Sequence, residues 1–169
     1  VSFPKQGILA FAQGRMTSES WGSEDEYTKL EVGIQGAYSF GPHTLTPSIA
    51  WGGSPSSALP PYDAFQLGGF GRLSGFAFDQ LIGHEYRFGS LKYAYEFARL
   101  PSALGKGLYL GGTLEAGRIA NQIDPTVASG TIYAGSLFFG VDSIFGPLYV
   151  AIGLNSAGDN ALYFVLGRP

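Results

Sequence analysis

The sequence predicts an all-β protein, an antiparallel transmembrane β-barrel or a large part of one. Apolar and polar residues alternate with a period of two, most clearly within 27–40 and 84–99. The alternating stretches are about ten residues long, the length that a tilted strand needs to cross a bilayer. No stretch approaches the ~18 consecutive apolar residues of a transmembrane helix. Such strands are compatible with hydrocarbon only in a closed barrel, which satisfies every backbone hydrogen-bonding group.

The composition supports this fold class. The chain has 169 residues, enough for one domain, and only 14% are charged, against roughly 25% in an average soluble domain. Aromatic residues make up 15% and there are 26 glycines, which suits aromatic girdles and a lumen lined by small residues. A soluble β-sandwich or a lipocalin-like barrel would show the same period. The low charge and the many tyrosines and phenylalanines near strand ends favour the membrane barrel.

Several function classes are excluded by the same counts. The net charge is −3 and Lys and Arg form no cluster, so nucleic acid is not an expected partner. The chain has no cysteine, which excludes disulfides, thiolate metal sites and a cysteine nucleophile. We expect no cofactor and no metal. The first residues lack the pattern of a signal peptide, so we expect a mature chain or a fragment of a longer one.

Eight strands are predicted, separated by connections of alternating length. The strands are expected at 6–16, 27–40, 43–52, 84–99, 107–118, 131–142, 147–156 and 160–168. Tight turns at 41–42 and 143–146 and the shorter link 100–106 alternate with long connections at 17–26, 53–83 and 119–130. Barrels of the outer membrane have short periplasmic turns and longer external loops. Eight strands can close alone around a lumen filled by side chains. As half of a larger barrel, they would leave the first and last strands without a neighbour.

The alternation assigns faces to most strands, although 6–16 alternates poorly and receives no assignment. In 84–99, Ser90, Lys92 and Glu96 are expected to face the lumen. The residues expected to face lipid in that strand are Leu91, Tyr93, Tyr95 and Phe97.

The connection 53–83 is too long and too apolar for an ordinary solvated loop. Loops of this length in a compact domain are usually functional. We expect residues 65–78 to fold into the barrel; the alternative is a loop that covers the barrel rim. The large apolar side chains that would be buried are Phe65, Leu67, Phe70, Leu73, Phe76 and Phe78.

This loop resembles the lumen loop of the outer-membrane assembly-factor superfamily, which includes the barrel assembly factor and the two-partner-secretion translocators. The residues that carry the resemblance are Leu67, Gly68, Gly69, Arg72, Leu73, Ser74, Gly75, Phe76, Gly83 and Tyr86–Phe88. Phe3-Pro4 with Gly7 resembles the opening of a strand in the same family, and Thr113–Gly117 resembles its acidic-residue–x–Gly motif. The resemblance implies that the chain is the C-terminal half of a barrel of about sixteen strands.

The chain departs from the family pattern at one position of the loop, and this departure suggests a particular branch of the superfamily. The superfamily usually has Arg where this chain has Ser74, and Ser resembles the patatin-like autotransporters of type V secretion. Carried over by motif, the lumen carboxylates are Glu96 and Glu115, near the loop, with Arg72 or Lys92 as the expected basic partner. The alternative is that both are ordinary lumen carboxylates paired with Lys29 or Lys92.

The resemblance implies an outer-membrane anchor or translocator for an N-terminal patatin-like lipase that lies outside this chain. The expected location is the bacterial outer membrane. The expected partners are the lipid bilayer, the barrel assembly machinery, the attached patatin-like domain and, through free sheet edges, a homo-oligomer.

The segment itself is expected to be non-catalytic, because it has no G-x-S-x-G nucleophile motif. The rival functions are a small outer-membrane acyltransferase or phospholipase and a structural or adhesive barrel. The enzyme would need His43 or His84 to meet a serine and an acid at one rim.

Overall fold

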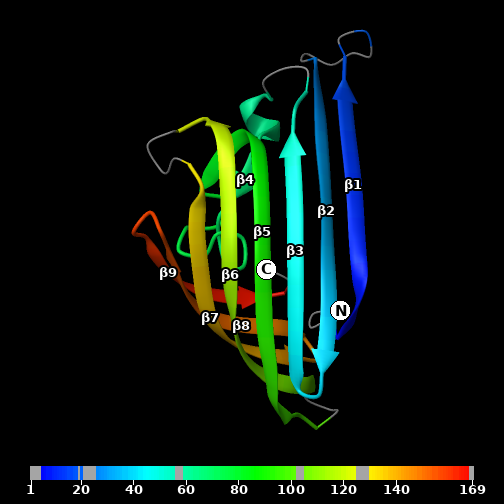
Figure 1. The fold of residues 1–169 in the computed structure, drawn as a ribbon, viewed down its shortest axis with the longest axis vertical. Coiled ribbons are helices and arrows are strands. Elements are labelled where there is room, and N and C mark those ends of the chain that lie inside the picture. The colour runs from blue at the N-terminus through cyan, green and yellow to red at the C-terminus, as the bar shows by residue number, and fades with distance from the viewer. Residues whose placement is uncertain are drawn as a thin grey trace.

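The computed structural model describes residues 5–18, 20, 26–55, 59–101, 105–124 and 130–167. They form one antiparallel sheet with the order β1-β2-β3-β5-β6-β7-β8-β9, and a short strand, β4, pairs with β5 outside this path. The sheet coils strongly: β1 to β5 run along the view in Figure 1, whereas β8 and β9 run across it. No helix in the described part of the chain is long and apolar enough to cross a membrane.

The described residues form eight long strands, as the alternation predicts. The bounds are β1 Gln6–Thr17, β2 Tyr27–Phe40, β3 His43–Gly53, β5 Leu81–Arg99, β6 Gly105–Gln122, β7 Ile132–Ser143, β8 Gly146–Asn155 and β9 Asn160–Leu166. Strands β5 and β6 are longer than expected, because they continue to pair beyond the alternating stretch, up to Gly83 and Gln122. The short strand β4, Phe65–Leu67, and the 3-10 turn Pro61–Asp63 lie inside the long connection and were not predicted.

The sheet does not close into a barrel. Among the described residues, β1 pairs only with β2 and β9 pairs only with β8. Of the two alternatives left open by the sequence, closure of eight strands on their own is not what the described residues show, while the antiparallel all-β architecture is confirmed. Both edge strands present unpaired backbone groups.

The two faces of the sheet differ in what covers them. On β5, Leu91, Tyr93, Tyr95 and Phe97 are exposed on the outward face. Lys92 and Glu96 are half-buried and Ala94 is buried on the inward face, inside the curve of the sheet. The residues of β1 are exposed on both faces except the half-buried Thr17 at its end, in keeping with the poor alternation of its sequence.

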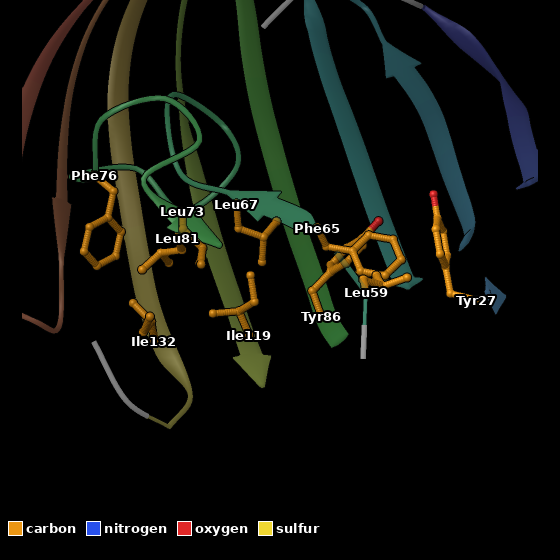
Figure 2. Packing of buried hydrophobic residues seen from close by; sticks show 10 residues of the cluster. All are labelled: Tyr27, Leu59, Phe65, Leu67, Leu73, Phe76, Leu81, Tyr86, Ile119 and Ile132. Carbon is orange, nitrogen blue, oxygen red and sulfur yellow. The ribbon is translucent and has the colours of Figure 1, made fainter. Parts of the chain in front are cut away.

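Residues 59–80, here called the inward loop, pack against the inward face. Five of the six large apolar side chains predicted to be buried in this loop are at most 3% exposed, whereas Phe78 is 53% exposed. Figure 2 shows a row of buried side chains between the inward loop and the strands, to which both contribute. The row consists of Tyr27, Leu59, Phe65, Leu67, Leu73, Phe76, Leu81, Tyr86, Ile119 and Ile132. Burying each large side chain contributes roughly 1.5–3 kcal/mol, which offsets the entropy lost on ordering the loop.

Candidate functional site: the contact between the inward loop and the sheet

The tip of the inward loop is a compact turn that places Ser74 against the sheet. The Gly68 amide donates to the Arg72 carbonyl (2.9 Å), and the Arg72 amide donates to the Gly69 carbonyl (3.0 Å). Gly75 has a φ of +100° and Leu73 a φ of +70°, a region that non-glycine residues rarely adopt. This turn leaves Ser74 fully buried.

Ser74 binds Glu115 of β6 through both its backbone and its side chain. The Ser74 amide donates to Glu115 Oε2 at 2.6 Å, and the Ser74 hydroxyl donates to Oε1 at 2.8 Å. Thr113 also donates its hydroxyl to Glu115 Oε1 and lies 2.7 Å from the Ser136 hydroxyl of β7. Hydrogen bonds to a carboxylate are the stronger kind, so the buried Glu115 is the main polar attachment of the loop tip.

A second attachment joins the loop tip to the edge strand β9. The Tyr163 hydroxyl accepts a hydrogen bond from the Gly75 amide (2.8 Å) and donates one to the Phe76 carbonyl (2.5 Å). Gly153 of β8 makes room for this contact, since a Cβ there would lie 2.7 Å from the Gly75 nitrogen and from the Ser74 Cβ. The tip therefore lies directly on the backbone of β8 and on the side chain of β9.

An aromatic cluster surrounds Lys92 beside the loop tip. The Lys92 ammonium lies 5.9 Å from the ring centroid of Phe70, 6.0 Å from that of Phe138 and 5.4 Å from that of Tyr149. Phe70 is buried and contacts both other rings, with centroids 5.5 and 5.3 Å away. Cation–π attraction operates at these separations. Lys92 also interacts electrostatically with Glu115, so a positive charge from the sheet faces the buried carboxylate.

The start of the inward loop is held on β1 and β2 by Asp63. Its carboxylate accepts hydrogen bonds from the Tyr27 hydroxyl (2.7 Å) and from the Lys29 ammonium (3.0 Å), and it forms an ion pair with Arg15 of β1 at 2.9 Å. Burial raises the pKa of Asp63, but the hydrogen bonds from Tyr27, Lys29 and Arg15 outweigh it and leave the pKa below its ordinary value. Through Arg15 and Tyr163, the inward loop thus contacts both edge strands.

We expect the attachment of Asp63 to weaken in acid. A carboxyl group whose pKa is lowered by folding stabilises the protein above its unfolded pKa, and this stabilisation is lost as the pH falls through the folded pKa. The difference in unfolding free energy between the native protein and Asp63→Asn should therefore shrink from pH 7 to pH 3. Urea titrations of both proteins at each pH measure it, and other carboxylates cancel in the comparison. A difference that is constant or grows in acid would contradict this role of Asp63.

The structure places the residues of the predicted loop motif together at the loop tip. Leu67, Leu73 and Phe76 are buried against the sheet, Gly68, Gly69 and Gly75 form the turns, and Ser74 contacts Glu115. Arg72 is the exception: it is exposed, and its guanidinium donates to the Gln66 carbonyl at 3.3 Å. Of the two basic partners expected for the lumen carboxylates, Arg72 is therefore wrong, because the turn directs Ser74, and not Arg72, toward the sheet, whereas Lys92 interacts electrostatically with Glu115.

The expectation that Glu96 lies near the loop is also wrong. In the register of β5 and β6, Glu115 lies opposite Ser90, and Glu96 is six residues further along β5, roughly 20 Å away. Glu96 faces inward, as predicted, but it pairs with Lys5 of the chain before β1 at 2.6 Å and with Arg99 at 3.0 Å. The two carboxylates share a face but not a site, so they do not repel each other at the loop.

Sequence reasoning missed Tyr163, Ser136 and Gly153. Tyr163 lies between the outward-facing Leu162 and Phe164, so the same alternation could have predicted that its side chain faces inward. Nothing local distinguishes Gly153 from the other glycines of the strands. Phe3-Pro4, part of the family resemblance, lies outside the described residues.

The two histidines do not form a hydrolase site among the described residues. The His43 Nδ1 atom lies 2.7 Å from the Tyr93 hydroxyl, and the His84 Nδ1 atom accepts the Leu59 amide at 3.0 Å. In the described ranges, neither imidazole has a hydrogen bond to a serine or a carboxylate. The same ranges hold no group of three His, Cys, Asp or Glu side chains that could bind a metal ion.

Comparison with known proteins agrees with this architecture. The Omp85 superfamily domain matches residues 1–139, a range that includes β1 to β6, the inward loop and most of β7. No curated protein is significantly similar to the chain. Members of the matching superfamily are outer-membrane translocators and assembly factors, so the match points to the bacterial outer membrane. The chain, an antiparallel sheet with a long loop on its inward face, belongs to the Omp85 superfamily.

Proposed function

We propose that this chain is an outer-membrane barrel module that anchors or translocates an N-terminal patatin-like lipase. The observation that carries the proposal is the contact of Ser74 with Glu115, which fixes the inward loop on the lumen wall. The assignment to the patatin branch depends on serine at position 74, where the superfamily usually has arginine. The segment itself supplies the membrane-spanning wall and the loop and carries no catalytic residue.

The outward face supports contact with lipid. Leu114, Leu137, Leu162 and Phe164 are each at least 70% exposed and lie on four outward strand positions. A soluble protein rarely leaves an apolar surface of this extent in water. In a bilayer, the same face is the ordinary lipid-facing band of a barrel.

The free edges support a larger barrel. Strands β1 and β9 each lack a second neighbour among the described residues, and an unpaired edge is unstable in hydrocarbon. In the full-length protein, further strands would pair with both edges and enclose the inward loop. A homo-oligomer formed through the same edges is the alternative way to satisfy them.

We expect Tyr95→Arg to destabilise the membrane-inserted protein. Tyr95 lies on the outward face of β5, and an arginine on the lipid face costs about 2–4 kcal/mol near the bilayer midplane and less near the interface. Urea titration in lipid vesicles measures the effect, with Tyr62→Arg in the exposed part of the inward loop for comparison. Leu91→Arg, four residues further from the tight turn on the same face, should cost more than Tyr95→Arg, because Tyr95 lies opposite His43 near the rim. A null effect of both variants would place this face outside the bilayer.

The lipase assignment is tested on the full-length protein in cells. Fractionation locates the protein, depletion of the barrel assembly machinery tests how it is inserted, and phospholipid hydrolysis by the outer-membrane fraction tests the attached domain. We expect an inserted protein whose hydrolase activity depends on a serine outside this chain. Insertion without any hydrolase domain would overturn the patatin-like branch alone, whereas recovery in the soluble fraction would overturn the membrane role as well.

A further inference from the structure

The outward face of the sheet has a hollow where two neighbouring strands carry glycine. Gly112 of β6 lies opposite Leu137 of β7, and Gly135 of β7 lies opposite Leu114 of β6. These two positions have no side chain, while the residues around them are large. The result is a groove of about 1140 Å³ whose lining is almost entirely apolar.

One end of the groove is polar. His43 lies there, at the start of β3, and its Nδ1 atom is 2.7 Å from the hydroxyl of Tyr93. The imidazole also stacks on the ring of Tyr95, with centroids 5.1 Å apart. One proton is used in the hydrogen bond between the two groups, so the pair with a neutral imidazole has one donor left for an anionic oxygen, either the Nε2–H group of His43 or the hydroxyl of Tyr93.

The groove lies across several strands and extends a short way along each, with its lining drawn from β3, β5, β6, β7, β8 and β9. From Tyr95 beside the polar end to Leu91 on the same strand, the groove follows four residues of β5, roughly 13 Å. His43 follows the tight turn at 41–42, so the polar end is at the rim with the short turns.

We propose that this groove binds one acyl chain of a phospholipid whose phosphate is held by His43 and Tyr93. The groove is apolar and carries hydrogen-bond donors at the membrane rim. A phospholipid matches this arrangement, because its acyl chain is apolar and its charged phosphate lies at the rim. The proposal rests on the lipid-facing role of this surface in the proposed function. It goes further, because it assigns a specific lipid site on a face that would otherwise contact only bulk lipid.

The test uses the protein in vesicles that contain a phospholipid with a photoreactive group in its acyl chain. Mass spectrometry locates the crosslinks. We expect several-fold more crosslinks on the outward residues of 108–114 and 135–139 than on Leu30, Val32 and Ile34 of β2, which are exposed on the outward face but do not line this groove. Unlabelled phosphatidylglycerol should compete for the groove, and diacylglycerol with the same chains, which lacks the phosphate, should not.

Variants separate the polar end from the groove. His43→Ala and Tyr93→Phe should each lower the groove crosslinks, by roughly tenfold if a charge-assisted hydrogen bond is lost. Leu137→Trp should lower them by filling the groove. Tyr38→Ala, an exposed outward aromatic at the same rim, is the matched control and should change nothing.

The following outcomes would contradict the proposed lipid site. Equal labelling of the groove and of β2, or equal competition by diacylglycerol, would show non-selective lipid contact. Groove labelling that falls as the protein-to-lipid ratio rises, while labelling of β2 does not, would show a second copy as the occupant. Absence of lipid crosslinks on both strands would overturn the membrane role itself, and that result is distinct from unselective labelling.

Discussion

Replacing Glu115 with alanine is expected to detach the inward loop and to destabilise the protein by about 3–5 kcal/mol, the cost of breaking a buried charged contact by removing one partner. The substitution leaves the Ser74 amide, the Ser74 hydroxyl and the Thr113 hydroxyl without their acceptor. It also leaves Lys92 in its aromatic cluster without the opposing charge. Glu115→Gln keeps the shape and should have a smaller effect.

Two measurements check the role of Glu115. Urea titration in lipid or detergent gives the loss of unfolding free energy, and the rate of tryptic cleavage after Arg72 reports the release of the loop. Glu96→Ala is the matched control, because Glu96 is also an inward carboxylate of the wall but pairs with the exposed Lys5 and Arg99. It should cost about 1 kcal/mol or less and leave the cleavage rate unchanged. If both variants accelerate cleavage equally, Glu115 does not hold the loop specifically.

A double-mutant cycle isolates the contact itself. Ser74→Ala removes the hydroxyl bond to Glu115 while the amide bond remains. The effects of Ser74→Ala and Glu115→Ala should be less than additive, since residues in one hydrogen-bond network couple by about 0.5–3 kcal/mol. Additive effects would mean that the two residues stabilise the protein independently.

Phe70→Ala is expected to cost about 3–5 kcal/mol, the range for truncating a buried phenylalanine. The Phe70 ring is 1% exposed and contacts the rings of Phe138, Tyr149 and Tyr163. Its removal leaves a cavity beside Lys92 and weakens the packing of the loop tip on β7, β8 and β9.

The same two assays measure this effect, with Phe78→Ala as the control. Phe78 belongs to the same loop, but it is 53% exposed, so its truncation should cost about 1 kcal/mol or less. We expect Phe70→Ala alone to accelerate cleavage after Arg72. Equal losses from the two variants would indicate that the loop is not packed as the structure describes.

The sequence alone determined the eight long strands, the faces of most of them and the inward fold of the long loop. Alternation with a period of two is a local property, so it assigned the outward position of Tyr95 and the inward position of Glu115 without any knowledge of neighbouring strands. The apolar content of residues 65–78 was likewise sufficient, because six large apolar side chains in one loop must find a buried surface.

The tertiary structure decided which of these residues meet. Glu96 and Glu115 face the same side, yet the register of β5 on β6 separates them by six positions, and register depends on long-range pairing that local patterns do not encode. The choice of Ser74 over Arg72 as the partner of Glu115 depends on the left-handed backbone at Leu73 and Gly75. The contact of Tyr163 with the loop needs a glycine at position 153. The open edges at β1 and β9 were also decided by the tertiary structure, because the closure of a barrel depends on the curvature and the number of all its strands together.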